Sequence, residues 1–84
     1  MDIKVQLETQ WVDRSEREKV RDLFEEEVQS VYSYFDIEVE SVFVSLRDDS
    51  QPNVLVGAAC SSDHVDFIIR YNTNGMRTAL YKRP

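Results

Sequence analysis

The segment from Ser15 to Phe35 constrains the fold most, because it is the one long stretch with the periodicity of an amphipathic helix. Its apolar residues recur at steps of three and four, which places them on one side of a helix. They are Val20, Leu23, Phe24, Val28, Val31, Tyr32 and Phe35. No glycine or proline interrupts the run. We therefore expect a single helix whose apolar side packs against a sheet.

The start of this helix has the spacing of a capping box. In such a box the hydroxyl of Ser15 accepts the backbone N–H of Glu18, and the Glu18 carboxylate accepts the N–H of Ser15. Asp13 is an alternative cap, which leaves the first helical residue open by about two positions.

The opposite side of the helix is acidic. The simplest interpretation is a face in water with ion pairs such as Glu18–Arg21 and Arg21–Glu25. However, residues 22–40 hold seven acids and neither lysine nor arginine, whereas a surface that serves only solubility mixes both signs. The unmixed charge favours a basic partner. The candidate partner-binding residues, which we name the acidic strip, are Asp22, Glu25, Glu26, Asp36, Glu38 and Glu40.

Glu27 falls inside the apolar stripe, between Val20 and Val31. A buried carboxylate has to be paired, hydrogen-bonded or neutralised. One interpretation places Glu27 at the edge of the stripe with its carboxylate in water. The other is a buried Glu27 paired with an arginine of the sheet, either Arg70 or Arg77.

Five segments have the composition or alternation of strands. They are Asp2–Glu8, IEVESVFVSL after Asp36, NVLVGAAC, HVDFIIRY and MRTALYKR. We expect an α+β fold in one domain, residues 1–84, with one helix on a curved antiparallel sheet of four to five strands in the order β-α-β-β-β-β. That order is similar to the order in cystatins. The Q-x-V-x-G loop of cystatins has no counterpart, because the hairpin here reads SLRDDSQPN.

Three positions in these segments call for special backbone geometry. The apolar phase changes after Val39, so either a bulge lies near Glu40–Ser41 or the early part of this segment leaves the sheet. The small residues from Gly57 to Ala59 allow a close approach, which we expect the helix to make. The sequence from Asn72 to Gly75 predicts a hairpin turn, with Gly75 at positive φ.

Candidate chemistry is sparse. Cys60, Asp63, His64 and Asp66 are the only cluster of nucleophile, base and carboxylate types. Acidic neighbours disfavour a reactive thiolate, and two metal-ligand types at C-x3-H spacing fall short of the four of a structural zinc site. Nucleotide-binding and hydrolase motifs are absent. We therefore expect a protein that is not an enzyme and that needs no cofactor or metal.

The lone cysteine, and the lack of a signal peptide or an apolar run of membrane-spanning length, predict a cytoplasmic protein without disulfides. The net charge is −6 in 84 residues, which disfavours direct binding to nucleic acid or membrane. The first hypothesis is therefore a small interaction protein that inhibits or regulates a basic surface. A nucleic-acid-binding protein bound by DNA mimicry is one such partner. Size and acidity are similar to those of small phage-encoded inhibitors.

The second hypothesis concerns the basic C-terminal hairpin. It carries four cations, Arg70, Arg77, Lys82 and Arg83, together with Tyr71 and Tyr81. Arginine and tyrosine on a two-stranded ribbon are typical of contacts with single-stranded nucleic acid. The last strand could instead pair with a second copy, giving a homodimer rather than a monomer.

Overall fold

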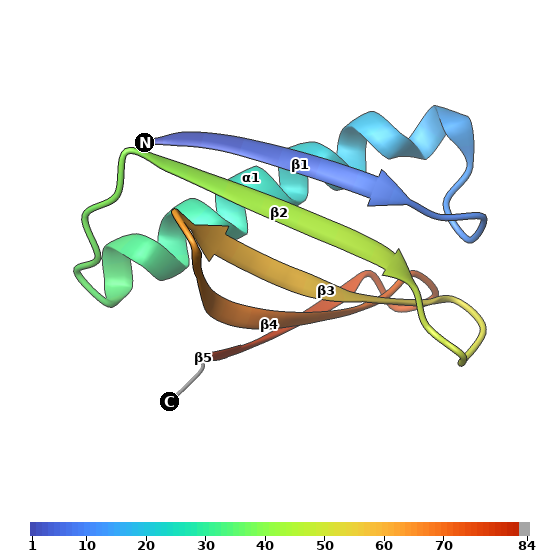
Figure 1. Cartoon of the computed structure of the whole chain (residues 1–84). Coiled ribbons are helices and arrows are strands. Elements are labelled where there is room, and N and C mark those ends of the chain that lie inside the picture. The colour runs from blue at the N-terminus through green and yellow to red at the C-terminus, as the bar shows by residue number, and fades with distance from the viewer. Residues whose placement is uncertain (83–84) are drawn as a thin grey trace.

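The computed structural model describes residues 1–82, which form one α-helix, one short 3-10 helix and a five-stranded sheet. The elements in chain order are β1 (Asp2–Glu8), η1 (Arg14–Glu16), α1 (Arg17–Tyr34), β2 (Ser41–Asp48), β3 (Val54–Ser61), β4 (His64–Asn72) and β5 (Arg77–Lys82). Figure 1 shows them in place. The α+β class, with one α-helix and five strands, is confirmed.

The sheet is mixed, with strand order β1-β2-β3-β4-β5. The pair β1–β2 is parallel and the other three pairs are antiparallel. The prediction of a wholly antiparallel sheet is therefore wrong at its first pair. The cause is the connection, because α1 carries the chain back along the sheet and β2 starts at the same end as β1 (Figure 1). The expected curvature of the sheet stays a prediction.

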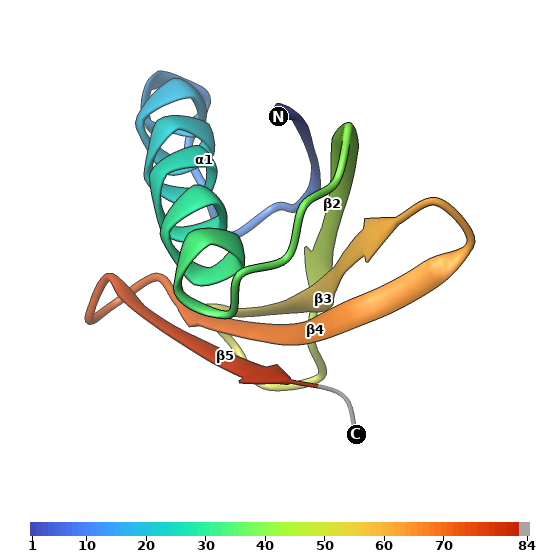
Figure 2. The same ribbon diagram turned by 90° about the vertical axis from the view of Figure 1, so that its left-hand side faces the viewer.

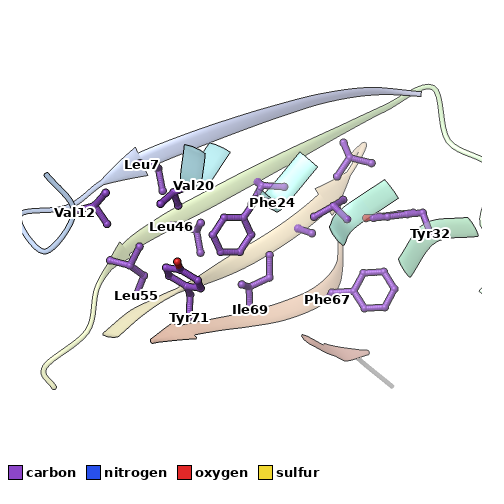
Figure 3. Packing of buried hydrophobic residues seen from close by; sticks show 14 residues of the cluster. Leu7, Val12, Val20, Phe24, Tyr32, Leu46, Leu55, Phe67, Ile69 and Tyr71 are labelled. Carbon is purple, nitrogen blue, oxygen red and sulfur yellow. The ribbon is translucent and has the colours of Figure 1, made fainter. Parts of the chain in front are cut away.

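The core lies between α1 and one face of the sheet (Figure 2). The helix contributes buried residues at every fourth position, Val20, Phe24, Val28 and Tyr32. Phe24 meets the ring of Tyr71 edge-on at 5.2 Å, and Tyr32 meets Phe67 in the same way at 5.2 Å. Figure 3 shows these rings among the aliphatic residues of the sheet. Aromatic pairs of this geometry stabilise the fold by more than the burial of their apolar surface alone.

The buried stripe is narrower than the sequence predicts. Leu23 and Val31 are only partly buried, and Phe35 is 41% exposed. Phe35 instead covers the edge of the core, with its ring 5.7 Å from that of Phe67. Packing against the sheet therefore buries only one row of helix residues. The apolar residues on either side of that row remain partly exposed to solvent.

The predicted capping box is wrong. Ser15 lies inside η1, and neither Asp13 before η1 nor Glu16 before α1 makes a side-chain capping hydrogen bond. The backbone N–H of Glu16 donates to the Asp13 carbonyl at 2.9 Å instead. The 3-10 turn thus satisfies the Glu16 N–H at the helix start through the backbone rather than through a side-chain cap.

The expected bulge near Glu40–Ser41 does not occur, because the chain takes the other route and stays out of the sheet until Ser41. Asp36 has a φ of 54°, and the N–H of Ile37 donates to the Tyr32 carbonyl at 2.9 Å. Ile37 and Val39 pack against the core from this connection. The register irregularity of the sheet lies elsewhere, between Ala59 and Cys60.

The close approach at Gly57 is made by the neighbouring strand rather than by the helix. A Cβ at Gly57 would lie 1.7 Å from the backbone oxygen of Ser45 on β2. In the hairpin between β4 and β5, the residue with positive φ is Met76, at 48°, and not Gly75. The hairpin itself is confirmed, whereas its predicted turn geometry is wrong.

Candidate functional site

The helical part of the acidic strip lies on the side of α1 that faces away from the sheet. Phe24 and Val28 are buried, so their side of the helix faces the core. Asp22, Glu25 and Glu26 lie on the other side and are all exposed. The predicted pairs Glu18–Arg21 and Arg21–Glu25 are not among the salt bridges of residues 1–82. The helix pair that forms is Lys19–Glu16, at 3.9 Å.

The second part of the strip lies on the connection between α1 and β2. Ile37 and Val39 pack inward, so the alternating residues Glu38 and Glu40 are exposed. Asp36, also exposed, follows the last turn of the helix. Across the part of the chain that the structure describes, none of the six strip carboxylates takes part in a salt bridge.

A groove borders the second part of the strip. It has a volume of about 600 Å³ and lies between the side of α1 and the connection. Its lining includes Glu38 and Glu40 on the connection, and Gln29 and Ser33 on the helix. Gln29 and Ser33 also line a shallower hollow that Glu26 borders. The fold therefore brings carboxylates that are up to 14 positions apart in the sequence to either side of the same polar side chains.

Glu27 lies at the edge of the core, half-buried, as the first interpretation expects. Its carboxylate is not simply in water, however, because Oε2 is shielded from solvent and has no hydrogen-bond partner. The pairing with an arginine of the sheet is wrong. Arg70 contacts Asp49 at 3.4 Å and also donates to Gln51, and Arg77 forms no salt bridge with Glu27 within residues 1–82. Glu27 lines a further groove of about 470 Å³ between α1 and β5.

The fold divides the basic hairpin between two faces. Arg70 and Arg77 lie on the face of the sheet away from α1. Their neighbours along the strands, such as the buried Tyr71, point to the face that α1 covers. Lys82 lies on the other face, with Nζ 4.6 Å from the ring centroid of Phe35. Arg83 lies outside the described residues. Tyr71 belongs to the core, and Tyr81 is 60% exposed.

Of the four residues in the cluster around Cys60, Asp66 forms hydrogen bonds within the fold, whereas Asp63 and His64 are exposed and Cys60 is half-buried. Asp66 accepts hydrogen bonds from the hydroxyls of Tyr32 at 2.5 Å and Ser61 at 2.6 Å. His64 is exposed, with Nε2 3.7 Å from Asp66. Burial, followed by the hydrogen bond with Asp66, raises the pKa of Tyr32, which keeps its hydroxyl a donor.

Metal ligands do not gather in the described part of the chain. Within residues 1–82, no three His, Cys, Asp or Glu side chains lie close enough together to hold a metal ion. Cys60 is half-buried on β3 and is paired across the sheet with Phe43. Cys60 therefore serves in strand packing, and Asp66 in hydrogen bonding near the end of the core.

A second cavity, which sequence reasoning missed, lies beside Trp11 and has a volume of about 190 Å³. Its lining joins Trp11 and Glu16 to Tyr71 and Met76. Burial, then the charges of Glu27 and Glu16, raises the pKa of Tyr71. The signal in the sequence was a single tryptophan, Trp11, in the connection that follows β1. Trp11 does pack against the core.

Together, the fold and the surface define a small α+β protein with exposed carboxylates on its helix and on the connection that follows it. No known protein family matches the chain, and searches of curated proteins and solved structures find no significant similarity. Among residues 1–82, no helix combines the length and apolar composition needed to cross a membrane. The case for a function therefore depends on the chemistry of the surface itself.

Proposed function

We propose that the protein is a small, non-enzymatic interaction protein that binds a basic macromolecular surface through its acidic strip and thereby inhibits or regulates its partner. The observation that carries this proposal is the state of the strip. Its six carboxylates are exposed, and none of them is neutralised by a salt bridge in residues 1–82. Self-repulsion among them is relieved when a partner supplies cations.

A nucleic-acid-binding protein is the partner class that suits this surface best. Such proteins carry lysine and arginine spaced to meet a row of phosphates. Carboxylates on a helix and on the adjoining connection form an extended negative surface, and the groove beside Gln29 and Ser33 offers room for side chains between them. The proposal is one of DNA mimicry, in the manner of a phage-type inhibitor.

Charge reversal of the strip tests the proposal. In the variant, Glu25, Glu26 and Glu38 are replaced by lysine. The matched control carries the same charge change at three exposed acids outside the strip that form no salt bridge in residues 1–82, Asp13, Glu18 and Asp63. Each protein is immobilised and exposed to a panel of purified basic nucleic-acid-binding proteins at about 50 and 200 mM salt, a range in which such contacts weaken strongly.

We expect the wild-type protein and the control to retain the same panel member, and the strip variant to lose it. Duplex DNA should release the retained protein, since both would compete for one basic surface. Equal retention by the strip variant and the control contradicts the proposal. Retention that resists both salt and DNA contradicts the mimicry in particular.

Self-association through β5 is a second candidate function, favoured by the position of β5 at the edge of the sheet. An exposed edge presents unpaired N–H and C=O groups to another strand. Gel filtration with light scattering tests this, because edge pairing doubles the mass. The related use of the hairpin for nucleic acid is tested by filter binding of mixed RNA and DNA at low salt.

A further inference from the structure

The groove between α1 and β5 exists because the helix covers the inner face of β4 but not that of β5. Tyr71 and Ile69 on β4 are fully buried, with 0% exposure. Their partners across the strand pair, Thr78 and Leu80, point to the same side and are only partly buried. The outer position of β5 is visible in Figure 2. The result is a groove of about 470 Å³ lined by Leu23, Glu26, Glu27, Ser30, Val31, Thr78 and Leu80.

Two polar atoms of this groove lack partners. Glu27 Oε2 and Thr78 Oγ1 are both shielded from solvent, and neither makes a hydrogen bond within residues 1–82. Buried polar groups of native proteins are almost always hydrogen-bonded, so an exception calls for an explanation. The two residues that carry these atoms, one on the helix and one on the facing strand, line the same groove. If the Glu27 and Thr78 side chains rotate their oxygens toward the groove, a ligand that donates hydrogen bonds would satisfy both.

The chain's own cations near this region are directed elsewhere. Arg70 is held by Asp49 and Gln51 on the far face of the sheet. Arg77 lies on that far face as well, since it is paired with Asn72 rather than with an inward residue. Lys82 stacks on the ring of Phe35. Within residues 1–82 no salt bridge involves Glu27, so a cation of another molecule could pair with it.

We propose that this groove binds an arginine side chain of the basic partner. Leu23, Val31 and Leu80 provide apolar walls for the aliphatic stem of an arginine. Its planar guanidinium carries five N–H donors in a fixed fork, so that one group can reach both a carboxylate and a hydroxyl. Exposed Glu26 adds a second negative charge at the same groove. A lysine ammonium, a single strongly hydrated charge, suits two acceptors on opposite walls less well.

This inference rests on the proposed function, because it names one side chain that the partner would insert beside the acidic strip. It can be tested separately, however, because Glu27 lines the groove and is not a residue of the acidic strip. The two ideas can therefore fail independently.

The test uses the full chain, labelled with ¹⁵N, and two blocked peptides, Gly-Arg-Gly-Arg-Gly and Gly-Lys-Gly-Lys-Gly, that differ only in the cationic residue. Their binding is followed by amide chemical shifts. The groove variants are Glu27→Gln and Thr78→Val, both close in shape to the native residues. The matched control is Glu18→Gln, which removes one charge from an exposed position of α1 outside the strip.

We expect the arginine peptide to shift amides of Leu23, Glu27, Thr78 and Leu80, and to bind at least several-fold more tightly than the lysine peptide. Glu27→Gln should weaken it about tenfold and Thr78→Val by a smaller factor, while Glu18→Gln has little effect. Equal binding of both peptides, or unchanged arginine binding in Glu27→Gln, overturns the inference. If strip reversal abolishes capture of a panel protein while Glu27→Gln leaves peptide binding intact, the groove proposal fails and the proposed function stands.

Discussion

The hydroxyl of Tyr32 on α1 donates a 2.5 Å hydrogen bond to Oδ2 of Asp66 on β4. The same oxygen accepts a 2.6 Å hydrogen bond from Ser61. The Asp66 side chain is 11% exposed, so these two donors replace most of the water that a free carboxylate would have. They tie the last part of the helix to the start of β4, next to the groove that borders the acidic strip.

Removal of the Tyr32 hydroxyl should therefore destabilise the fold. Hydrogen bonds to charged groups contribute about 1.5–3 kcal/mol, and we expect Tyr32→Phe to lower the free energy of unfolding by about 2 kcal/mol at pH 7. Ser61→Ala should cost less, since the stronger phenol donor remains. Urea unfolding followed by circular dichroism measures both. A Tyr32→Phe variant as stable as wild type would mean that water replaces the lost donor.

The raised pKa values of Tyr32 and Tyr71 predict a loss of stability in alkali. Both groups hold their protons more tightly in the folded state than in the unfolded chain, where a tyrosine titrates near about 10. Their contribution is complete below that unfolded pKa and falls as the pH rises above it, because the unfolded state then binds fewer protons. Urea unfolding at pH 8, 9, 10 and 11 should show this decline. Tyr32→Phe should reduce the slope above pH 10, and a parallel profile would contradict the assignment.

Gly57→Ala should be one of the most damaging small substitutions. Its Cβ would lie 1.7 Å from the Ser45 oxygen and 2.7 Å from the Ser45 carbonyl carbon. Both atoms belong to the backbone of β2, so the strands would have to separate, at a cost of about 3 kcal/mol or more. Gly75→Ala is the matched control, because its nearest neighbour is Arg77 Cγ at 4.0 Å. Thermal unfolding should place Gly57→Ala far below wild type and Gly75→Ala near it.

Glu27→Gln and Thr78→Val should stabilise the unbound protein. Each change removes a polar atom, or its charge, that is shielded from solvent without a partner. We expect a gain of about 0.5–1 kcal/mol for each variant, the range in which such exchanges for a less polar group fall. Glu25→Gln, in the exposed strip, should change stability by less than about 0.5 kcal/mol. Chemical denaturation measures all three. A loss of stability in both groove variants would show that water or an internal partner already satisfies these atoms.

Phe24 and Phe35 should differ in their contribution to the stability of the fold, although both belong to the same periodic apolar stripe. Phe24 is 0% exposed and packs on Tyr71, whereas Phe35 is 41% exposed. Phe24→Ala should cost about 3–5 kcal/mol, enough to unfold most of a chain this small, while Phe35→Ala should cost about 1 kcal/mol. Circular dichroism at 25 °C distinguishes the two outcomes. Similar losses in both variants would contradict the narrow core.

The prediction of the helix succeeded and the prediction of its cap failed for related reasons. The burial of Val20, Phe24, Val28 and Tyr32 is written into their spacing, since a helix repeats every 3.6 residues. The capping box also had the right spacing, but Ser15 was drawn into a 3-10 turn. That turn is held from outside, because Arg17 Nη2 donates to the Thr9 carbonyl at 2.7 Å and the Thr9 hydroxyl bonds to Asp48 on β2.

The amino-acid sequence by itself determined the α+β class, the inward side of the helix and the exposure of the acidic strip. These features follow from the local alternation of apolar and polar side chains, which records burial. Only the tertiary structure decided the parallel pairing of β1 with β2, the approach of β2 to Gly57, and the meeting of Glu27 with Thr78 across a groove. Strand direction depends on the path of the connecting helix, and contacts between distant segments depend on the spacing of packed backbones. Neither strand direction nor these long-range contacts produce a periodic pattern of apolar residues. Both therefore become visible only in the folded structure.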